Sequence, residues 1–182
     1  MKRSVLLLLF VFNVQAIFAQ NSDWIKIKDN DAAYIINFPS QPEKADQDVP
    51  TDKGTVKMYT YTLQTTDDTN IIYMSSFTEY PNSFFPNKLE SAEMQNEVLD
   101  NSVNGAVTNT KGTLASEKKI FLNGYRGRMI KISIEGGFII QMKVILVGIK
   151  LYLAQVIYTE ENEDNLNSKR FFDSLELINV KP

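Results

Sequence analysis

The most constraining feature of this sequence is a run of long apolar segments between residues 118 and 159. It predicts three long strands joined by two tight turns, one at Gly136–Gly137 and one at residues 148–150. Isoleucines at positions 130, 132 and 134 mark one buried face of the first strand. In residues 151–159 both faces are apolar, which is typical of a central strand covered on both sides. We therefore expect a β-sheet protein whose core centres on this stretch.

Further strands are expected before this stretch. Alternation and β-branched or aromatic residues predict strands at residues 24–28, 33–38, 54–64 and 70–80. In these strands we expect the tyrosines at 59, 61 and 73 to pack rather than to form a ligand platform. Residues 43–53 are polar and predict an exposed edge strand or loop. Its aspartates at 46, 48 and 52 lack the Asp-x-Asp-x-Asp-Gly calcium pattern, so we expect no metal site.

Two segments predict helices. Residues 89–108 carry apolar side chains at three- and four-residue spacing, which predicts one long helix with a single apolar stripe. Residues 166–172 predict a short helix capped by Asp164 or Asn165, with Leu166 and one of Phe171 and Phe172 turned inward. Before the long helix, adjacent phenylalanines at 84 and 85 either plug the edge of the core or form an exposed contact patch, and we favour the plug.

Residues 1–20 have the pattern of a cleaved signal peptide. Lys2 and Arg3 precede an apolar run, and the small residue Ala19 suits a cleavage site before Gln20 or Asn21. The alternative is a membrane anchor, but about ten apolar residues are too few, because a spanning helix needs ~20. We expect residues 21–182 to form one domain, periplasmic or secreted, with no transmembrane segment in the mature chain.

The composition excludes several classes of function. The chain has no histidine, which excludes Ser-His and Cys-His catalysis and histidine zinc sites. It has no cysteine, which excludes thiol nucleophiles, disulfides, iron–sulfur clusters and a lipoprotein anchor. The net charge of −3 does not suggest nucleic acid as a partner. We therefore expect a protein without cofactor, metal or enzymatic activity.

Several short motifs resemble those of the PsbP/DcrB-like superfamily. They are the F-P-x-x-P strand exit at residues 38–42, the L-x-G-x-x-G-R segment at residues 122–128, the V-G-x-x-L-Y hairpin at residues 147–152 and the closing F-x-x-S-L at residues 171–175. The resemblance spans about residues 24–178. It implies an α+β fold with a central antiparallel β-sheet covered by helices in an α/β/α arrangement. It also implies an accessory or binding role, because members of this superfamily are not typically enzymes.

These observations favour a non-enzymatic exported accessory or protein-binding domain of the bacterial cell envelope, whose partner is an envelope protein. The alternative is a small-ligand or lipid carrier with a pocket between the sheet and the helix at residues 89–108. The candidate binding residues are Tyr125, Arg126 and Arg128, beside the Asn123–Gly124 hairpin signal, where two arginines at an exposed tip could hold an anion. A hydrolase built on this cluster is the least favoured reading.

Overall fold

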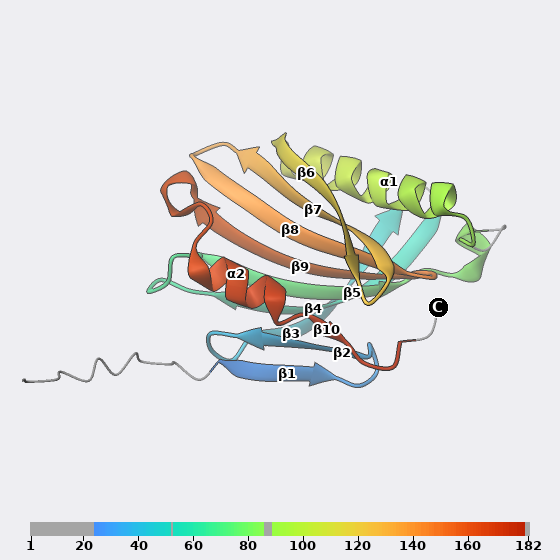
Figure 1. Ribbon diagram of the computed structural model, residues 1–182, viewed down its shortest axis with the longest axis horizontal. Coiled ribbons are helices and arrows are strands. Elements are labelled where there is room, and N and C mark those ends of the chain that lie inside the picture. The colour runs from blue at the N-terminus through green and yellow to red at the C-terminus, as the bar shows by residue number, and fades with distance from the viewer. Residues whose placement is uncertain (1–23, 52, 86–88, 181–182) are drawn as a thin grey trace, which may run out of the picture.

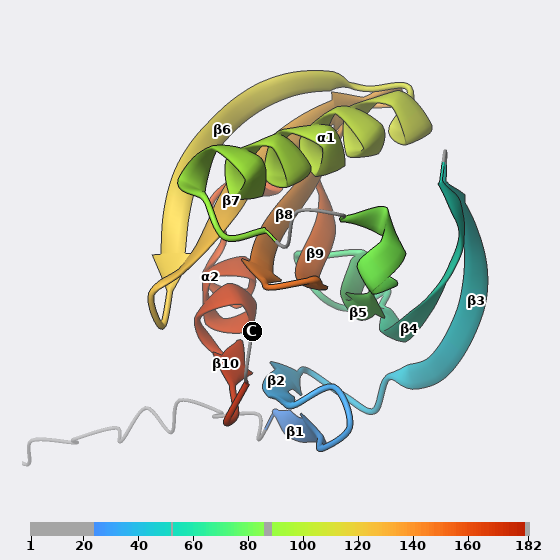
Figure 2. The ribbon, with the colours of Figure 1, turned by 90° about the vertical axis from the view of Figure 1, so that its right-hand side faces the viewer.

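The computed structural model describes residues 24–51, 53–85 and 89–180, so the signal peptide expected at residues 1–20 lies outside the described residues. A seven-stranded antiparallel sheet forms the middle layer (Figure 1). The long helix α1 lies on one face of this sheet, and a three-stranded sheet and the short helix α2 lie on the other (Figure 2). The expected α+β fold is confirmed, with the small sheet as an additional part of one covering layer.

The described residues form ten strands in two sheets, two α-helices and two 3₁₀ turns. The small sheet contains β1 (Ile25–Asp29), β2 (Tyr34–Phe38) and β10 (Glu176–Leu177). The large sheet contains β3 (Glu43–Thr51), β4 (Gly54–Gln64), β5 (Ile72–Glu79), β6 (Thr113–Leu122), β7 (Tyr125–Ile134), β8 (Phe138–Val147) and β9 (Lys150–Thr159). The helices are α1 (Ala92–Thr110), α2 (Leu166–Asp173) and the 3₁₀ turns η1 (Asn82–Phe84) and η2 (Glu160–Asn162).

The large sheet joins two meanders side by side. Its strand order is β3-β4-β5-β9-β8-β7-β6, so the β3–β5 meander meets the β6–β9 meander where β5 pairs with β9. Helix α1 makes the connection between the two meanders. The last strand of the apolar stretch, β9, is therefore central, as expected. The polar strand β3 is an edge strand, also as expected, with almost all of its side chains exposed.

The first of the three strands expected in the apolar stretch is in fact two. Asn123 and Gly124 both have positive φ, 52° and 86°, and they form the turn between β6 and β7. Such a turn matches the twist of the two flanking strands. The stretch at residues 118–159 thus contains the end of β6 and all of β7, β8 and β9.

Both faces of the large sheet are buried in separate hydrophobic clusters. Beneath α1, Leu99 and Val103 pack on Ile130 and Ile132 of β7, and all four are at most 3% exposed. On the other face the core is richer in aromatic residues, contributed by both sheets and α2. Its most buried aromatic members are Tyr34, Phe38, Tyr73, Tyr152, Tyr158 and Phe171.

The helix boundaries differ from the expected ones by a few residues. Helix α1 begins at Ala92 rather than at residue 89, because the Ser91 side chain accepts a hydrogen bond from the Met94 amide and caps the first turn. Asn165 caps α2 in the same way, because its side chain accepts a hydrogen bond from the Ser168 amide. Of the two expected caps, Asp164 and Asn165, the second is therefore the cap. Leu166 was expected inside the core, but it is 81% exposed because the inward positions of this short helix belong to Phe171 and Phe172.

A buried polar junction fixes the small helix to the start of β5. Asn70 is fully buried and exchanges two side-chain hydrogen bonds, of 3.0 and 3.1 Å, with Asn165. Asn70 also accepts a bond from Ser168, and Tyr73 donates to Asp68 at 2.7 Å. These bonds satisfy groups that would be costly to bury unpaired. The far end of β5, at Glu79, lies in the region described next.

Candidate functional site

The expected site at the β6–β7 hairpin contains a structural arginine. Arg128 is only 1% exposed and not part of an exposed tip, which corrects the expectation from the sequence. Its guanidinium lies 2.5 Å from Asp100 and 3.1 Å from Asn96 on α1, and 2.8 Å from Glu117 on β6. Because the guanidinium is enclosed by these partners, Arg128 joins α1 to β6 and β7 and is not available to bind an anion.

The two other predicted residues are half-buried and lie on opposite sides of the sheet from one another. Tyr125 packs against the aromatic core, and its hydroxyl donates to the Val180 carbonyl at 3.2 Å. Arg126 lies over the ring of Phe121, 5.4 Å from its centre. The structure therefore does not bring Tyr125, Arg126 and Arg128 together as one binding cluster.

The region between the sheet and α1 is filled by side chains. Two small hollows, of about 230 and 260 Å³, lie beside α1. Both lie beside Phe84 and Phe85, which plug the end of this layer as expected: Phe84 is buried, and Phe85 packs on the α1 core. Both hollows beside α1 are thus smaller than the roughly 300–1,000 Å³ usual for ligand pockets, so neither fits the pocket expected between sheet and helix.

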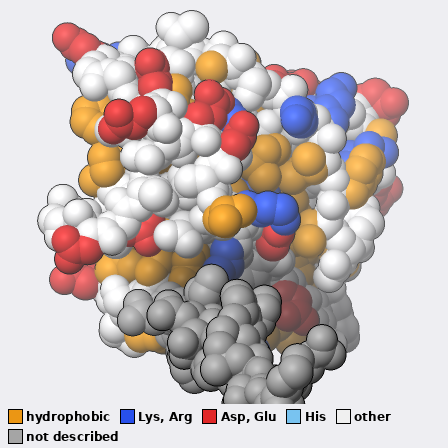
Figure 3. Space-filling model, turned by 60° about the vertical axis from the view of Figure 1, so that its left-hand side comes forward, with side chains coloured by type: hydrophobic (Ala, Val, Ile, Leu, Met, Phe, Trp, Pro, Cys, Tyr) orange, Lys and Arg blue, Asp and Glu red, His pale blue; other side chains and the backbone are white. Residues whose placement is uncertain are grey.

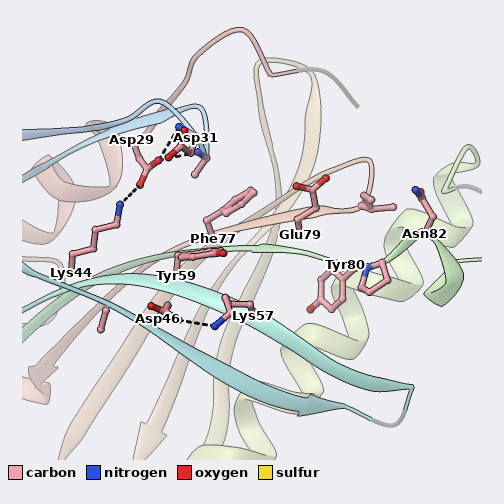
Figure 4. A pocket seen from close by; sticks show the side chains of 14 residues that line it. Asp29, Asp31, Lys44, Asp46, Lys57, Tyr59, Phe77, Glu79, Tyr80 and Asn82 are labelled. Atoms are coloured by element: carbon pink, nitrogen blue, oxygen red, sulfur yellow. Dashed lines mark hydrogen bonds and ion pairs between the residues drawn. The ribbon is translucent and has the colours of Figure 1, made fainter.

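A larger cavity lies on the opposite face, between the large sheet and the β1–β2 turn. We call it the β3–β5 cleft, and its volume is about 890 Å³. It is lined by Asp29, Asp31, Ala32, Lys44, Ala45, Asp46, Lys57, Tyr59, Phe77, Glu79, Tyr80, Pro81, Asn82 and Ile149. Figure 4 shows that side chains from β3, β4 and β5 point toward those of the β1–β2 turn across this space. A cleft of this size is in the range of known ligand sites.

An aromatic pair forms the middle of the cleft. Tyr59 of β4 and Phe77 of β5 are opposite one another in the strand register and stack, with ring centres 6.4 Å apart and planes inclined by 27°. Phe77 is 7% exposed, whereas Tyr59 is 40% exposed. The tyrosines at 59 and 73 both pack as expected, Tyr73 in the buried core and Tyr59 against Phe77, but Tyr59 is also partly exposed. One aromatic face is available to a bound group.

Asp29 connects the two sheets at one wall of the cleft. Its side chain accepts hydrogen bonds from the Ala32 amide at 2.9 Å and from the Tyr61 hydroxyl at 2.9 Å, and it pairs with Lys44 at 3.2 Å. Burial of Asp29 alone would raise its pKa, but these three partners outweigh burial and hold the pKa below the ordinary value. Asp29 is thus a fixed anion that keeps the β1–β2 turn over β4.

The opposite rim is formed by an ion-pair cluster on the exposed edge. Lys57 lies 2.8 Å from Asp46 and 3.4 Å from Asp48, and these contacts raise the pKa of Lys57. Two of the three aspartates considered as calcium ligands, Asp46 and Asp48, are therefore paired with a lysine, and Asp52 lies outside the described residues. No group of three or more potential metal-ligating side chains occurs within residues 24–51, 53–85 and 89–180.

One further face of the molecule carries a mixture of hydrophobic, charged and uncharged side chains (Figure 3). On the face shown in Figure 3, hydrophobic side chains occur in several separate patches between charged and uncharged polar groups. None of the helices in the described part of the chain is both long and apolar enough to span a membrane.

The residues of the β3–β5 cleft were not identified from the sequence. Asp29 and Asp31 belong to a polar turn, and Glu79 ends a strand, so each matches an ordinary solvent-exposed position. The one available signal in the sequence was the presence of tyrosines and a lysine in β4, the strand next to the edge strand β3. That signal does not show which face of the strand is covered.

Comparisons with known proteins bear on the fold. A scan against models of protein families and a search of curated proteins both found no match. Among solved structures, the chain is similar to the solution structure of cyanobacterial PsbP (CyanoP) from Synechocystis sp. PCC 6803, with a TM-score of 0.51 and 12% sequence identity. The similarity covers 88% of this chain and 95% of that chain. The chain therefore has the PsbP-like fold that its motifs indicate, and at this identity the likeness concerns the fold alone.

Proposed function

We propose that this chain is a non-enzymatic accessory domain of the bacterial cell envelope that binds another protein through the β3–β5 cleft. The observation that carries the proposal is the cleft itself, a hollow of about 890 Å³ with an exposed aromatic face. The absence of histidine and cysteine from the sequence supports a role without catalysis. The PsbP-like fold is compatible with an accessory role.

Export is the part of the proposal that depends on residues 1–20. Their charged start, apolar run and small exit residues support cleavage and release into the periplasm or the medium. Fractionation of cells that express the full chain, followed by mass measurement of the recovered protein, tests this point. A protein beginning at Gln20 or Asn21 in the periplasm or medium supports export, and an uncleaved cytoplasmic chain contradicts it.

Binding at the cleft is tested by crosslinking in the native host. A photo-crosslinking phenylalanine derivative replaces either Tyr59 in the cleft or Leu166, which is exposed on α2 near the other end of β5. We expect a defined adduct with one envelope protein from position 59 and none from position 166. If position 59 yields no adduct, or if both positions yield the same adducts, the cleft is not the binding surface.

A small-ligand carrier is the second candidate function. The volume of the β3–β5 cleft suits a small ligand better than the hollows near α1, where the pocket was first expected. Native mass spectrometry of freshly purified protein tests it. A discrete additional mass that disappears in a Tyr59→Ala variant supports a carrier. A spectrum of the unliganded chain alone contradicts it.

A further inference from the structure

The charges that line the β3–β5 cleft do not balance. Its lining residues include four carboxylates and two lysines. Lys44 pairs with Asp29, and Lys57 pairs with Asp46. Asp31 and Glu79 are left, and neither forms an ion pair with any residue in the described part of the chain. Both are exposed and neither is ion-paired, although Lys150 is opposite Glu79 in the β5–β9 pairing and lines a neighbouring hollow together with Asp31.

The position of these two carboxylates relative to the aromatic pair is visible in Figure 4. Asp31 comes from the β1–β2 turn and Glu79 from the end of β5, and in this view both lie on the side of Phe77 that faces away from Tyr59. Lys150 is opposite Glu79 in the pairing of β5 with β9, yet no ion pair joins the two side chains. A cation that enters the cleft therefore meets carboxylates on two different elements.

The aromatic face provides a second, independent argument. Aromatic rings attract cations to their faces, because the ring face carries partial negative charge. Elsewhere in the described residues this face is used by the chain itself, with Lys or Arg over the rings of Trp24, Tyr61, Phe85 and Phe121. Within the part of the chain that the structure describes, Tyr59 and Phe121 are the aromatic side chains among the exposed large hydrophobic residues. Phe121 is covered by Arg126, whereas no described lysine or arginine lies over Tyr59.

We propose that the β3–β5 cleft is a binding site for a cationic group, the guanidinium or ammonium of an arginine or lysine side chain in an extended segment of the partner protein. Asp31 and Glu79 accept hydrogen bonds from the cation, and the exposed ring of Tyr59, on the other side of Phe77, lies against a neighbouring part of the same segment. Electrostatic complementarity selects a basic segment and rejects an acidic one. This inference rests on the proposed function, since it identifies the chemistry of the partner at the same site.

The test uses short peptides that differ in one charge. The probe is Ac-Gly-Arg-Gly-NH2, and the control is the same peptide with citrulline, which has nearly the same shape but no charge. Binding to the mature protein is followed by the shifts of its backbone amide NMR signals. We expect saturable shifts clustered around Asp31, Tyr59 and Glu79 with a Kd on the order of 1 mM at low salt, weaker binding as salt is added, and at least fivefold weaker binding of the citrulline peptide.

Variants of the cleft residues test whether the preference for the arginine peptide arises in the cleft. The double variant Asp31→Asn with Glu79→Gln is expected to bind the arginine peptide at least fivefold more weakly, and Tyr59→Leu to bind it about threefold more weakly. Asp67→Asn is the matched control, because Asp67 is exposed on the β4–β5 turn at the other end of β5, and its affinity is expected to equal that of the wild type. The dispersion of the same amide signals shows that each variant is folded.

The outcomes separate this inference from the proposed function. Equal binding of arginine and citrulline peptides, or unchanged affinity of the Asp31/Glu79 variant, overturns the cationic site even if crosslinking from position 59 captures a protein. Charge-selective peptide binding without any crosslinked envelope protein supports the cationic site and removes the proposed protein partner.

Discussion

Replacement of Arg128 by methionine tests whether the hairpin arginine is structural. The substitution keeps most of the buried stem and removes the guanidinium, which contacts Asp100, Asn96 and Glu117 at 2.5, 3.1 and 2.8 Å. Removal of one partner of a fully buried pair costs about 3–5 kcal/mol. Here Asp100 is 55% and Glu117 32% exposed, so their carboxylates regain water when the guanidinium is lost. We therefore expect a smaller loss in the free energy of unfolding, about 2–3 kcal/mol.

Urea denaturation of the mature protein at pH 7, followed by far-UV circular dichroism, measures this loss. The single tryptophan, Trp24, gives a second probe from the opposite side of the sheet. Thermal unfolding is expected to shift downward by about 4–12 °C, since 1 kcal/mol corresponds to roughly 2–4 °C for a domain of this size.

Arg126→Met is the matched control, because Arg126 is the neighbouring arginine and its guanidinium lies over the ring of the exposed Phe121. Its expected cost is below about 0.5 kcal/mol, as for most surface substitutions. If Arg128→Met unfolds within about 0.5 kcal/mol of the wild type with an unchanged urea dependence, the contacts of Arg128 with α1 and β6 do not stabilise the fold.

Three further predictions concern the core, a close backbone approach and the pH dependence. Leu99→Ala, at a fully buried site under α1, is expected to lower the free energy of unfolding by about 2–5 kcal/mol, and a loss below 1 kcal/mol would contradict the packing. Gly127→Ala places a Cβ 2.3 Å from the Val144 carbonyl oxygen, so we expect a loss above about 2 kcal/mol in the same urea assay, and a neutral result would contradict the close approach. The pKa of Asp29 is lowered because hydrogen bonds outweigh the effect of burial, so its ionised form contributes stability above the ordinary value of 3.8 that is lost as pH falls through the folded-state pKa. Asp29→Asn is therefore expected to be less stable than the wild type at pH 7, with a deficit that shrinks below about pH 4. Unfolding curves at several pH values measure this deficit, and a constant deficit would refute the linkage.

Much of the fold could be predicted because it depends on local patterns. Alternating apolar residues at 130, 132 and 134 identified a buried face, and the doubly apolar strand at residues 151–159 identified the centre of the sheet. Turn residues such as Gly136 and Gly137 identified strand ends, because few other residues adopt positive φ readily. The errors were also local, at Leu166 and at the start of α1, where a cap rather than the apolar stripe sets the boundary.

The candidate site could not be predicted in the same way. Arg128 and Arg126 are two residues apart and look equivalent in the sequence, yet one is enclosed by α1 and the other is not. Likewise Tyr59 and Tyr73 have the same residue type in paired strands, but only Tyr73 is covered by Phe171 of α2 and by Trp24, just before β1. What covers a side chain is decided by elements far away in the sequence.

By itself, the sequence determined most of the strands, the central position of β9, the two helices and the exclusion of histidine and cysteine chemistry, because these follow from residue type and periodicity. Only the tertiary structure decided that the arginine of the hairpin is buried, that the space under α1 is filled, and that an open cleft lies between β3–β5 and the β1–β2 turn. The physical reason is that burial and charge pairing depend on which distant surfaces meet. Asp29 pairs with Lys44 and Tyr61 across two sheets, and this contact forms the wall beside which Asp31 and Tyr59 remain open to a partner.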